Sequence, residues 1–397
     1  MIRSLKFKNF QSFQDDTEVS FELPKSASSR GYERLADDGT RVSTVLAVFG
    51  ANASGKTALL KSAAFLFWFM RSSFHLKANE PIAIPDRILN PNEPSSFEMI
   101  FDADGETWKY ELRLNEKRVL WEALYKKQTR FSYLFKRTWN EDRNTYDVQL
   151  QSFDMLLSEA KKVRQNASLI STAIQYNSDS SDVIARYVAH CNVAIDGRPH
   201  YRANLAWAHD TYNVLEHAKE RAVNILRDWD IGLDGIEISE EQSTTDSNGK
   251  ERPVLRAHFT HSRSDGSSFR LPYDLESNGT QSAYVLLALL IPVLDTGGLA
   301  VIDEMESDLH PHLLESLLRL FDSEETNPFG AQLFFTSHTT KVLEYLGKSQ
   351  TYFVEKYDCV STAYRGDQIR GLRSDDNFRA KYEAGALGAL PEVRNDA

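Results

Sequence analysis

One short segment constrains this chain more than any other feature. Residues 50–57 read Gly-Ala-Asn-Ala-Ser-Gly-Lys-Thr and fit the pattern G-x-x-x-x-G-K-[ST]. The apolar residues 43–49 before it predict a buried strand, and residues 58–66 after it predict a helix. Between a strand and a helix, the backbone N–H groups of such a loop surround a phosphate, and the helix N-terminus adds partial positive charge. The segment therefore predicts a phosphate-binding loop in an α/β fold.

The loop also predicts which side chains bind a nucleotide. Lys56 would reach the β- and γ-phosphates, and the Thr57 hydroxyl would take one coordination position of a Mg²⁺ ion. ATP and Mg²⁺ are therefore the expected ligands. The residues of the loop expected to bind them are Gly50, Asn52, Ala53, Ser54, Gly55, Lys56 and Thr57.

Composition excludes several other classes of protein. The 397 residues are 41% hydrophobic and 26% charged, as in ordinary globular proteins, and the net charge of −11 argues against a broad nucleic-acid-binding surface. The two cysteines, Cys191 and Cys359, lie far apart and give neither a disulfide framework nor a zinc-binding pattern. The longest apolar run, 283–294, is too short to cross a bilayer, and residues 1–7 lack the shape of a signal peptide. We expect a cytoplasmic protein that does not bind membranes.

The pattern of apolar residues divides the chain into three parts. In residues 1–153, four alternating segments between 96 and 139 follow the phosphate-binding loop and predict an antiparallel meander. Residues 154–230 contain few glycines and predict a small helical subdomain without a long coiled coil. Residues 231–397 alternate helix and strand, which predicts a parallel sheet.

A second half of the site is expected at residues 299–304. Leu299 to Ile302 are apolar and predict a buried strand. Asp303 and Glu304 follow at its carboxyl end, where α/β sheets bind ligands. Asp303 would hold Mg²⁺, and Glu304 would act as general base on the attacking water. Two acids after a strand also occur for solubility alone, so this interpretation depends on the phosphate-binding loop.

A third element, at residues 274–281, directly precedes an apolar helix. Ser277 suits the N-cap position of that helix, and Gly279 allows a ligand to approach the backbone closely. A helix N-terminus with a free hydroxyl and N–H groups can bind a γ-phosphate. Ordinary helix capping explains the same residues, so the segment alone selects no function.

In their order along the chain, these motifs resemble the head of an ABC-type ATPase of the SMC, RecF and OLD branch. Residues 7–13 resemble the opening of such heads, 276–281 the signature segment, 305–311 the D-loop region and 334–338 the switch strand. The resemblance implies an α/β fold with a mostly parallel RecA-like sheet, an antiparallel β lobe and a small helical subdomain. Asn278 stands where the usual signature has a glycine, which puts the shape of that turn in doubt.

The resemblance also assigns roles to further residues. His338 would contact the γ-phosphate as a catalytic residue beside Glu304. Gln175 is the candidate for the glutamine that joins Thr57 and Asp303 at the metal, although a surface or core glutamine explains it as well. The residues expected to contact ATP from outside the phosphate-binding loop are Ser277, Gly279 and Asp308.

Four further segments resemble the AbiLi/RloA group of bacterial anti-phage defence ATPases, which includes PARIS AriA-like and Septu PtuA-like subunits. They are residues 122–125, 163–167, 352–356 and 382–391. The resemblance implies an ATPase, converting ATP and water to ADP and phosphate, that serves as the sensor or regulatory subunit of a defence system. It also implies a homodimer or higher oligomer, because the signature segment of an ABC head meets the ATP of another subunit. A separate, nuclease-like effector from a neighbouring gene is the expected partner.

Other functions fit part of the same sequence. A DNA repair or chromosome-maintenance ATPase of the RecF or SMC kind would bind DNA directly, which the net acidity opposes. Residues 117–137 carry seven basic residues, one acid and several aromatic side chains, and would suit a polyanion. A charged sheet edge that resists aggregation is the more common explanation of such a segment. A scaffold that binds ATP without hydrolysing it is disfavoured by Asp303, Glu304 and His338.

Overall fold

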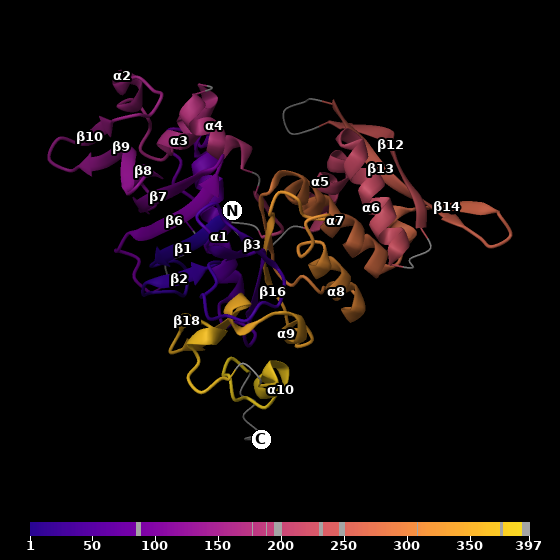
Figure 1. Ribbon diagram of the computed structural model, residues 1–397. Helices are drawn as coiled ribbons and strands as arrows, with labels where there is room; N and C mark the ends of the chain where they lie inside the picture. The colour runs from indigo at the N-terminus through magenta and orange to yellow at the C-terminus, as the bar shows by residue number, and fades with distance from the viewer. Residues whose placement is uncertain are drawn as a thin grey trace.

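The computed structural model shows a molecule built in layers (Figure 1). It describes residues 1–84, 89–176, 178–187, 189–193, 201–229, 233–245, 251–307, 309–373 and 376–390. An antiparallel sheet, the helix α1, a mostly parallel sheet and a group of helices follow one another across the molecule. Hydrophobic side chains fill the two spaces on either side of the parallel sheet.

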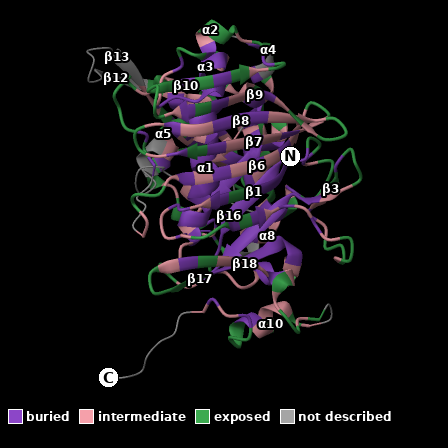
Figure 2. Cartoon of the chain, turned by 90° about the vertical axis from the view of Figure 1, so that its left-hand side faces the viewer, coloured by how far each residue is buried: buried purple, intermediate pink, exposed green. Residues whose placement is uncertain are grey.

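The first layer is a seven-stranded antiparallel sheet in the order β10-β9-β8-β7-β6-β1-β2. The predicted meander is confirmed, because β6 to β9 follow one another both in sequence and in the sheet. Alternate residues are buried along β6 and β7, and Figure 2 shows exposed residues gathered at the connecting loops. Its strands are β1 (Ile2–Lys8), β2 (Thr17–Ser20), β6 (Ser95–Ala103), β7 (Glu106–Leu114), β8 (Val119–Lys127), β9 (Phe131–Asn140) and β10 (Thr145–Leu150).

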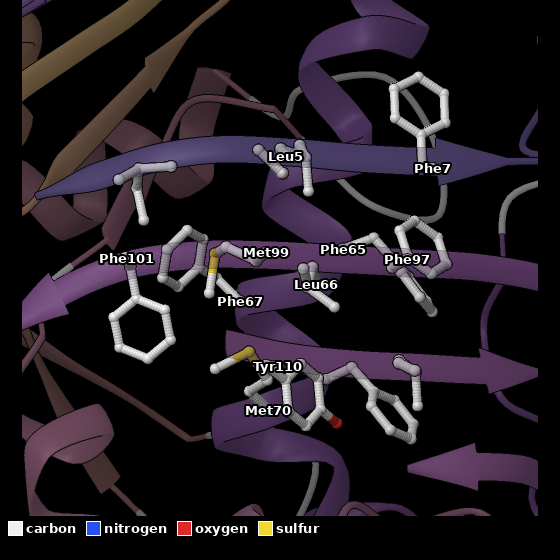
Figure 3. Close-up of a cluster of buried hydrophobic side chains, with 14 of the residues drawn as sticks. Leu5, Phe7, Phe65, Leu66, Phe67, Met70, Phe97, Met99, Phe101 and Tyr110 are labelled. Carbon is white, nitrogen blue, oxygen red and sulfur yellow. The ribbon is translucent and has the colours of Figure 1, made fainter. Parts of the chain in front are cut away.

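Helix α1 (Lys56–Ser72) lies between the two sheets and is buried along most of its length. Figure 3 shows Phe65 and Met70 of α1 facing Phe97 and Tyr110 of the antiparallel sheet. The ring centroids of Phe65 and Phe97 are 5.3 Å apart. On its other side α1 packs against β15 and β16 of the parallel sheet. A helix that is apolar all round is typical of this doubly covered position.

The second layer is a six-stranded sheet in the order β11-β15-β16-β5-β17-β18, and all neighbours except β17 and β18 are parallel. Along β5, Leu46 and Val48 face the core that contains α1, whereas Val45, Ala47 and Phe49 belong to the other core. The predicted α/β fold with a mostly parallel sheet is confirmed. Its strands are β5 (Val45–Phe49), β11 (Ala189–Cys191), β15 (Leu299–Ile302), β16 (Gln332–Thr336), β17 (Thr351–Tyr357) and β18 (Val360–Arg365).

The second core covers the other face of the parallel sheet, and its central helix is α7. By length and composition α7 is the one described helix that could cross a membrane, but 61% of its apolar window is buried in the protein. Its composition is therefore accounted for by the core. The helices that contribute to this core are α5 (Tyr201–Val214), α6 (Glu216–Asp228), α7 (Asn278–Thr296), α8 (Pro311–Arg319), α9 (Val342–Tyr345) and α10 (Phe378–Glu383).

The helices predicted for residues 154–230 divide between the two cores. Helices α2 (Leu157–Ala160), α3 (Leu169–Gln175) and α4 (Asp179–Arg186) pack with α1 and the antiparallel sheet. Helices α5 and α6 pack on α7, and β11 between the two groups joins the edge of the parallel sheet. The described residues of the stretch therefore contribute to both cores and connect them.

A small antiparallel sheet stands beside α5 and α6 and leads into α7 (Figure 1). Its last strand is followed by a 3₁₀ turn, and α7 begins three residues after that turn. This places the N-terminus of α7 next to the small sheet. The remaining elements are β3 (Glu33–Leu35), β4 (Arg41–Ser43), β12 (Leu233–Thr245), β13 (Glu251–Ser262), β14 (Ser268–Pro272), and the 3₁₀ turns η1 (Ser73–His75), η2 (Tyr273–Leu275), η3 (Lys348–Gln350) and η4 (Gly366–Gln368).

Candidate nucleotide-binding site

The phosphate-binding loop (residues 50–57, the P-loop) leaves the carboxyl end of β5 and enters α1. Gly50 lies so close to β17 that a Cβ atom there would be 2.4 Å from the carbonyl oxygen of Val354. Gly55 precedes the helix with φ of 114°, and neither a side-chain cap nor an acidic residue occupies the first turn of α1. Uncapped N–H groups at a helix N-terminus favour an anion. The local geometry is that of a loop shaped for phosphate.

The Lys56 side chain folds back over this loop. Its Nζ atom donates hydrogen bonds to the carbonyl oxygens of Gly50, at 2.8 Å, and Ala51, at 3.0 Å. Burial lowers the pKa of the ammonium group, and the nearby carboxylates of Asp303 and Glu304 act in the opposite direction. A phosphate at the loop would add negative charge and favour the protonated ammonium further.

The structure brings Thr57 and Asp303 together, as the motifs predict. Thr57 Oγ1 donates a hydrogen bond to Asp303 Oδ2 at 2.8 Å. Strand β16 lies between β5 and β15, and its last residue, Thr336, donates to Asp303 Oδ1 at 2.7 Å. Both carboxylate oxygens thus accept hydrogen bonds from hydroxyl groups, one from the first turn of α1 and one from the end of the neighbouring strand β16. No sequence signal marks Thr336, because one threonine ending an apolar strand is an ordinary residue there.

Asn192 holds the backbone of the same acidic residue. Its Oδ1 atom accepts a hydrogen bond from Asp303 N at 2.7 Å, and its Nδ2 atom donates to Asp303 O at 2.9 Å. Asn192 directly follows β11, so it lies at the same edge of the sheet as the acids. A three-residue strand is too short to be recognised by its pattern, which is why the sequence does not reveal this asparagine.

Gln175 is not brought to this place. It is the exposed last residue of α3. Ser171 of the same helix contacts Ser73, which lies beyond the C-terminal end of α1, at a hydroxyl–hydroxyl distance of 2.9 Å. The P-loop is at the opposite end of α1. Among the hydrogen bonds between described residues, none joins Gln175 to Thr57 or Asp303, so the amide found beside the acidic strand is that of Asn192.

Glu304 and His338 are both exposed at the edge of the site. The backbone N–H of Glu304 donates to Thr336 Oγ1 at 2.7 Å, and its φ of 50° is uncommon for a residue other than glycine. The backbone N–H of His338 donates to Glu306 Oε1. His338 and residues 50–52 line a pocket of about 280 Å³, so the end of the switch strand faces the P-loop across this pocket.

The signature segment (residues 276–281) lies apart from the P-loop. Ser277 caps α7, and its Oγ atom accepts a hydrogen bond from Thr280 N at 3.1 Å. Within the described part of the chain, no hydrogen bond or ion pair links Ser277 or Gly279 to residues 50–57. Asp308, predicted to contact ATP, lies outside the described residues. The P-loop leads into α1 in one core and the signature segment leads into α7 in the other, so these two parts of the predicted site start different cores of one chain.

The residues present fit a Mg²⁺-nucleotide. Ser54 Oγ is buried in the P-loop without a hydrogen-bond partner, which suits a ligand oxygen. The described residues contain no group of three or more His, Cys, Asp or Glu side chains that could hold a metal by themselves. Mg²⁺ is usually bound by one or two carboxylates together with substrate phosphates, and Thr57 with Asp303 offers that incomplete protein set.

Comparisons with known proteins agree with a nucleotide-binding site. The model of a family described as "AAA domain, putative AbiEii toxin, Type IV TA system" matches residues 45–344, so the chain belongs to that family. No curated protein matches. Similar solved structures include the SMC head domain from Thermotoga maritima, 16% identical over 92% of this chain and 98% of that one, with a TM-score of 0.43. Another is an Smc head bound to the C-winged helix domain of ScpA, 13% identical over 91% and 96%, with a TM-score of 0.45.

Proposed function

We propose that this member of the AAA family is an ATPase that closes into a dimer around ATP and hydrolyses it to ADP and phosphate. The observation that carries the proposal is the direct contact of Thr57 with Asp303, with Glu304 and His338 at the same edge of the parallel sheet. Ser277, which the signature resemblance assigns to the γ-phosphate, is absent from that edge. A second copy placed head to tail supplies it, and each copy then completes the site of the other.

Each side chain has a defined part in this reaction. Lys56 exchanges the carbonyl oxygens of its own loop for phosphate oxygens, and Thr57 and Asp303 hold Mg²⁺, which neutralises phosphate charge when bound. Glu304 accepts a proton from the attacking water, and its exposure leaves room for that water beside the P-loop. His338 donates a hydrogen bond to the γ-phosphate. Loss of that phosphate on hydrolysis removes the contacts that join the two copies.

We further propose that the ATPase is the sensor or regulatory subunit of a bacterial anti-phage defence system in the cytoplasm and controls a separate effector. The family description names a type IV TA system, which supports a role beside a second protein. Two of the segments that resemble defence ATPases contact each other in the fold. Ala389 N, from residues 382–391, donates to Glu355 Oε1, from residues 352–356, at 2.7 Å. Co-purification with the product of a neighbouring gene tests the role, and a chain that elutes alone would count against it.

Replacing Lys56 tests nucleotide binding directly. We expect Lys56→Ala to abolish binding of ATP, because it removes the only P-loop ammonium group and the two hydrogen bonds that it makes within the loop. Isothermal titration with Mg-ATP measures the loss. Lys162→Ala, at an exposed lysine of another surface, is the control and should bind as the parent does. If the Lys56→Ala variant binds ATP as tightly as the parent, the P-loop is not the site of nucleotide binding.

Replacing Glu304 tests the dimer. We expect Glu304→Gln to form an ATP-bound dimer that persists, because the amide keeps the shape of the side chain but cannot accept the proton of the water. Size-exclusion chromatography with light scattering, in the presence of Mg-ATP, measures the mass. Glu324→Gln, at an exposed glutamate remote from the P-loop in sequence, serves as control. A Glu304→Gln variant that stays monomeric with ATP bound would exclude the sandwich arrangement.

Direct binding of DNA has weaker support. Glu122 and Arg137, one acid and one basic residue of the 117–137 segment, form a fully buried pair and contribute nothing to its surface. Among the other basic residues, Lys126 pairs with Glu106, and Arg118 and Lys127 pair with further acids. A polyanion would have to compete with these acids. Strong, salt-sensitive stimulation of the ATPase by DNA would favour the repair function instead.

A further inference from the structure

A histidine and a glutamate form a close pair beside the signature segment. His261 Nε2 lies 2.6 Å from Glu276 Oε1. Both side chains are largely buried, with exposed fractions of 12% for His261 and 5% for Glu276. Glu276 directly precedes Ser277, the N-cap of α7. The first side chain of the signature segment is therefore a carboxylate that turns inward.

Both partners of this pair are held by further contacts. His261 lies on β13 opposite Phe269 of β14, and the two rings stack with centroids 5.2 Å apart. The backbone of Glu276 is fixed as well, because its N–H donates to Tyr273 O at 3.1 Å and its carbonyl accepts from Gln281 Nε2 at 3.0 Å. The pair thus joins the start of α7 to the small sheet at a defined place.

The neighbours of Glu276 in sequence point the other way. Ser277 and Asn278 are exposed, so the N-terminus of α7 is open to solvent while the carboxylate next to it is covered. Asp274, another acid near this end, is exposed and pairs with Arg256 at 3.3 Å. A helix N-terminus attracts anions through its N–H groups. An unpaired carboxylate one residue away would repel the same anions.

We propose that His261 is a positioning residue of the signature segment. Through the contact between His261 Nε2 and Glu276 Oε1 it holds the Glu276 carboxylate inward, so that the N-terminus of α7 can receive the γ-phosphate of ATP bound to a second copy of the chain. The inference rests on the proposed ATP-dependent dimer. Without His261, the carboxylate loses its partner and turns toward solvent beside Ser277, where it opposes the incoming phosphate.

The test measures dimer formation against Mg-ATP concentration in full-length chain carrying Glu304→Gln. We expect His261→Ala to raise the ATP concentration for half-maximal dimerisation by about fivefold, the size of one like-charge contact between groups exposed to water. Adding Glu276→Gln to His261→Ala should restore dimerisation, because the amide carries no charge. Binding of ADP to the P-loop, measured by titration, should stay unchanged in every variant.

A matched control is present on the same helix. His217 and Asp295 form a second histidine–carboxylate pair, 3.2 Å apart, at the other end of α7, where Asp295 also pairs with Arg221, and His217→Ala should dimerise as the parent does. The proposal is overturned if His261→Ala dimerises normally, or if the double variant stays as impaired as His261→Ala alone. If His261→Ala fails to fold, the single variant Glu276→Gln provides the test. The proposal requires that this variant dimerises at an ATP concentration equal to or lower than that of the parent. A parent that does not dimerise with ATP would instead overturn the proposed function itself.

Discussion

Glu122 joins several elements of this molecule through one buried carboxylate. Its side chain and that of Arg137 are fully buried, with Glu122 Oε2 3.5 Å from Arg137 Nη1. The carboxylate also accepts hydrogen bonds from Tyr110 Oη at 3.0 Å, Ser168 Oγ at 2.8 Å and Leu169 N at 3.0 Å. These contacts tie strands of the antiparallel sheet to the start of α3. A buried charge with this many partners is costly to leave unpaired.

Removing this carboxylate should destabilise the fold strongly. We expect Glu122→Ala to lower the free energy of unfolding by about 3–5 kcal/mol, because it leaves the Arg137 guanidinium as an uncompensated buried charge. Urea unfolding measures the change. The exposed pair Arg143 and Asp147 provides the control, and Asp147→Ala should cost less than about 1 kcal/mol. If the two variants lose the same free energy of unfolding, burial of the Glu122–Arg137 pair does not make its loss more costly.

The site residues that belong to a sequence motif could be predicted. The residues that hold them in place through tertiary hydrogen bonds could not. Lys56, Thr57 and Asp303 could be assigned because a fixed spacing or a strand end determines where such side chains lie. Thr336 and Asn192 hold Asp303 through hydrogen bonds across neighbouring strands. Those partners are distant in sequence, and neither residue type is unusual at its position. Only the pairing of the strands shows that they belong to the site.

At the scale of elements, β11 (Ala189–Cys191) is the edge strand that places Asn192 beside the acidic strand. Its central residue, His190, has a buried Nδ1 atom without a hydrogen-bond partner, and its ring lies 5.1 Å from that of Trp207. Burial lowers the pKa of His190 from 6.5 to about 4, and the nearby Arg71 acts in the same direction. The imidazole of His190 is therefore neutral when β11 is packed in the folded protein.

Acid should weaken the docking of β11. The unfolded chain binds a proton at His190 near pH 6.5, whereas the folded chain binds it only near pH 4, so protons favour unfolding between these values. This contribution to stability is complete above pH 6.5 and is lost as pH falls, by at most about 3 kcal/mol. Urea unfolding at pH 7 and pH 4.5 measures the loss. His190→Gln should lose less stability on acidification than the parent, and an identical pH dependence would contradict the assignment.

Helices and strands with a regular pattern of apolar residues could be predicted from the sequence. Elements that depend on pairing or packing with distant parts of the chain could not. The meander β6 to β9 alternates apolar and polar residues because one of its faces is covered. The acidic strand β15 was predicted at Leu299 to Ile302, where it is found. Strand β11 has three residues and exists through its pairing with β15. The helices of residues 154–230 were predicted as one group, but their apolar faces belong to two different cores.

At the scale of the whole molecule, the P-loop and the signature segment lead into helices of two different hydrophobic cores. The P-loop opens into α1, which lies in the core shared by the two large sheets. The signature segment begins α7, which is the centre of the other core. The sequence predicted both motifs and the resemblance predicted that two copies are needed. Their separation within one chain, however, comes from how the layers stack, which no local pattern encodes.

Helix α1 limits how any other protein can recognise the bound nucleotide. Its residues from Ala58 to Phe67 are all buried, so the back of the P-loop is closed to partners. At the site, Asn52, Ala53, Glu304 and His338 are exposed, so partners can reach the site from this side. The second copy of the chain would cover these residues when ATP is bound. A third protein must therefore compete with it there, or recognise a surface that the joining of two copies creates.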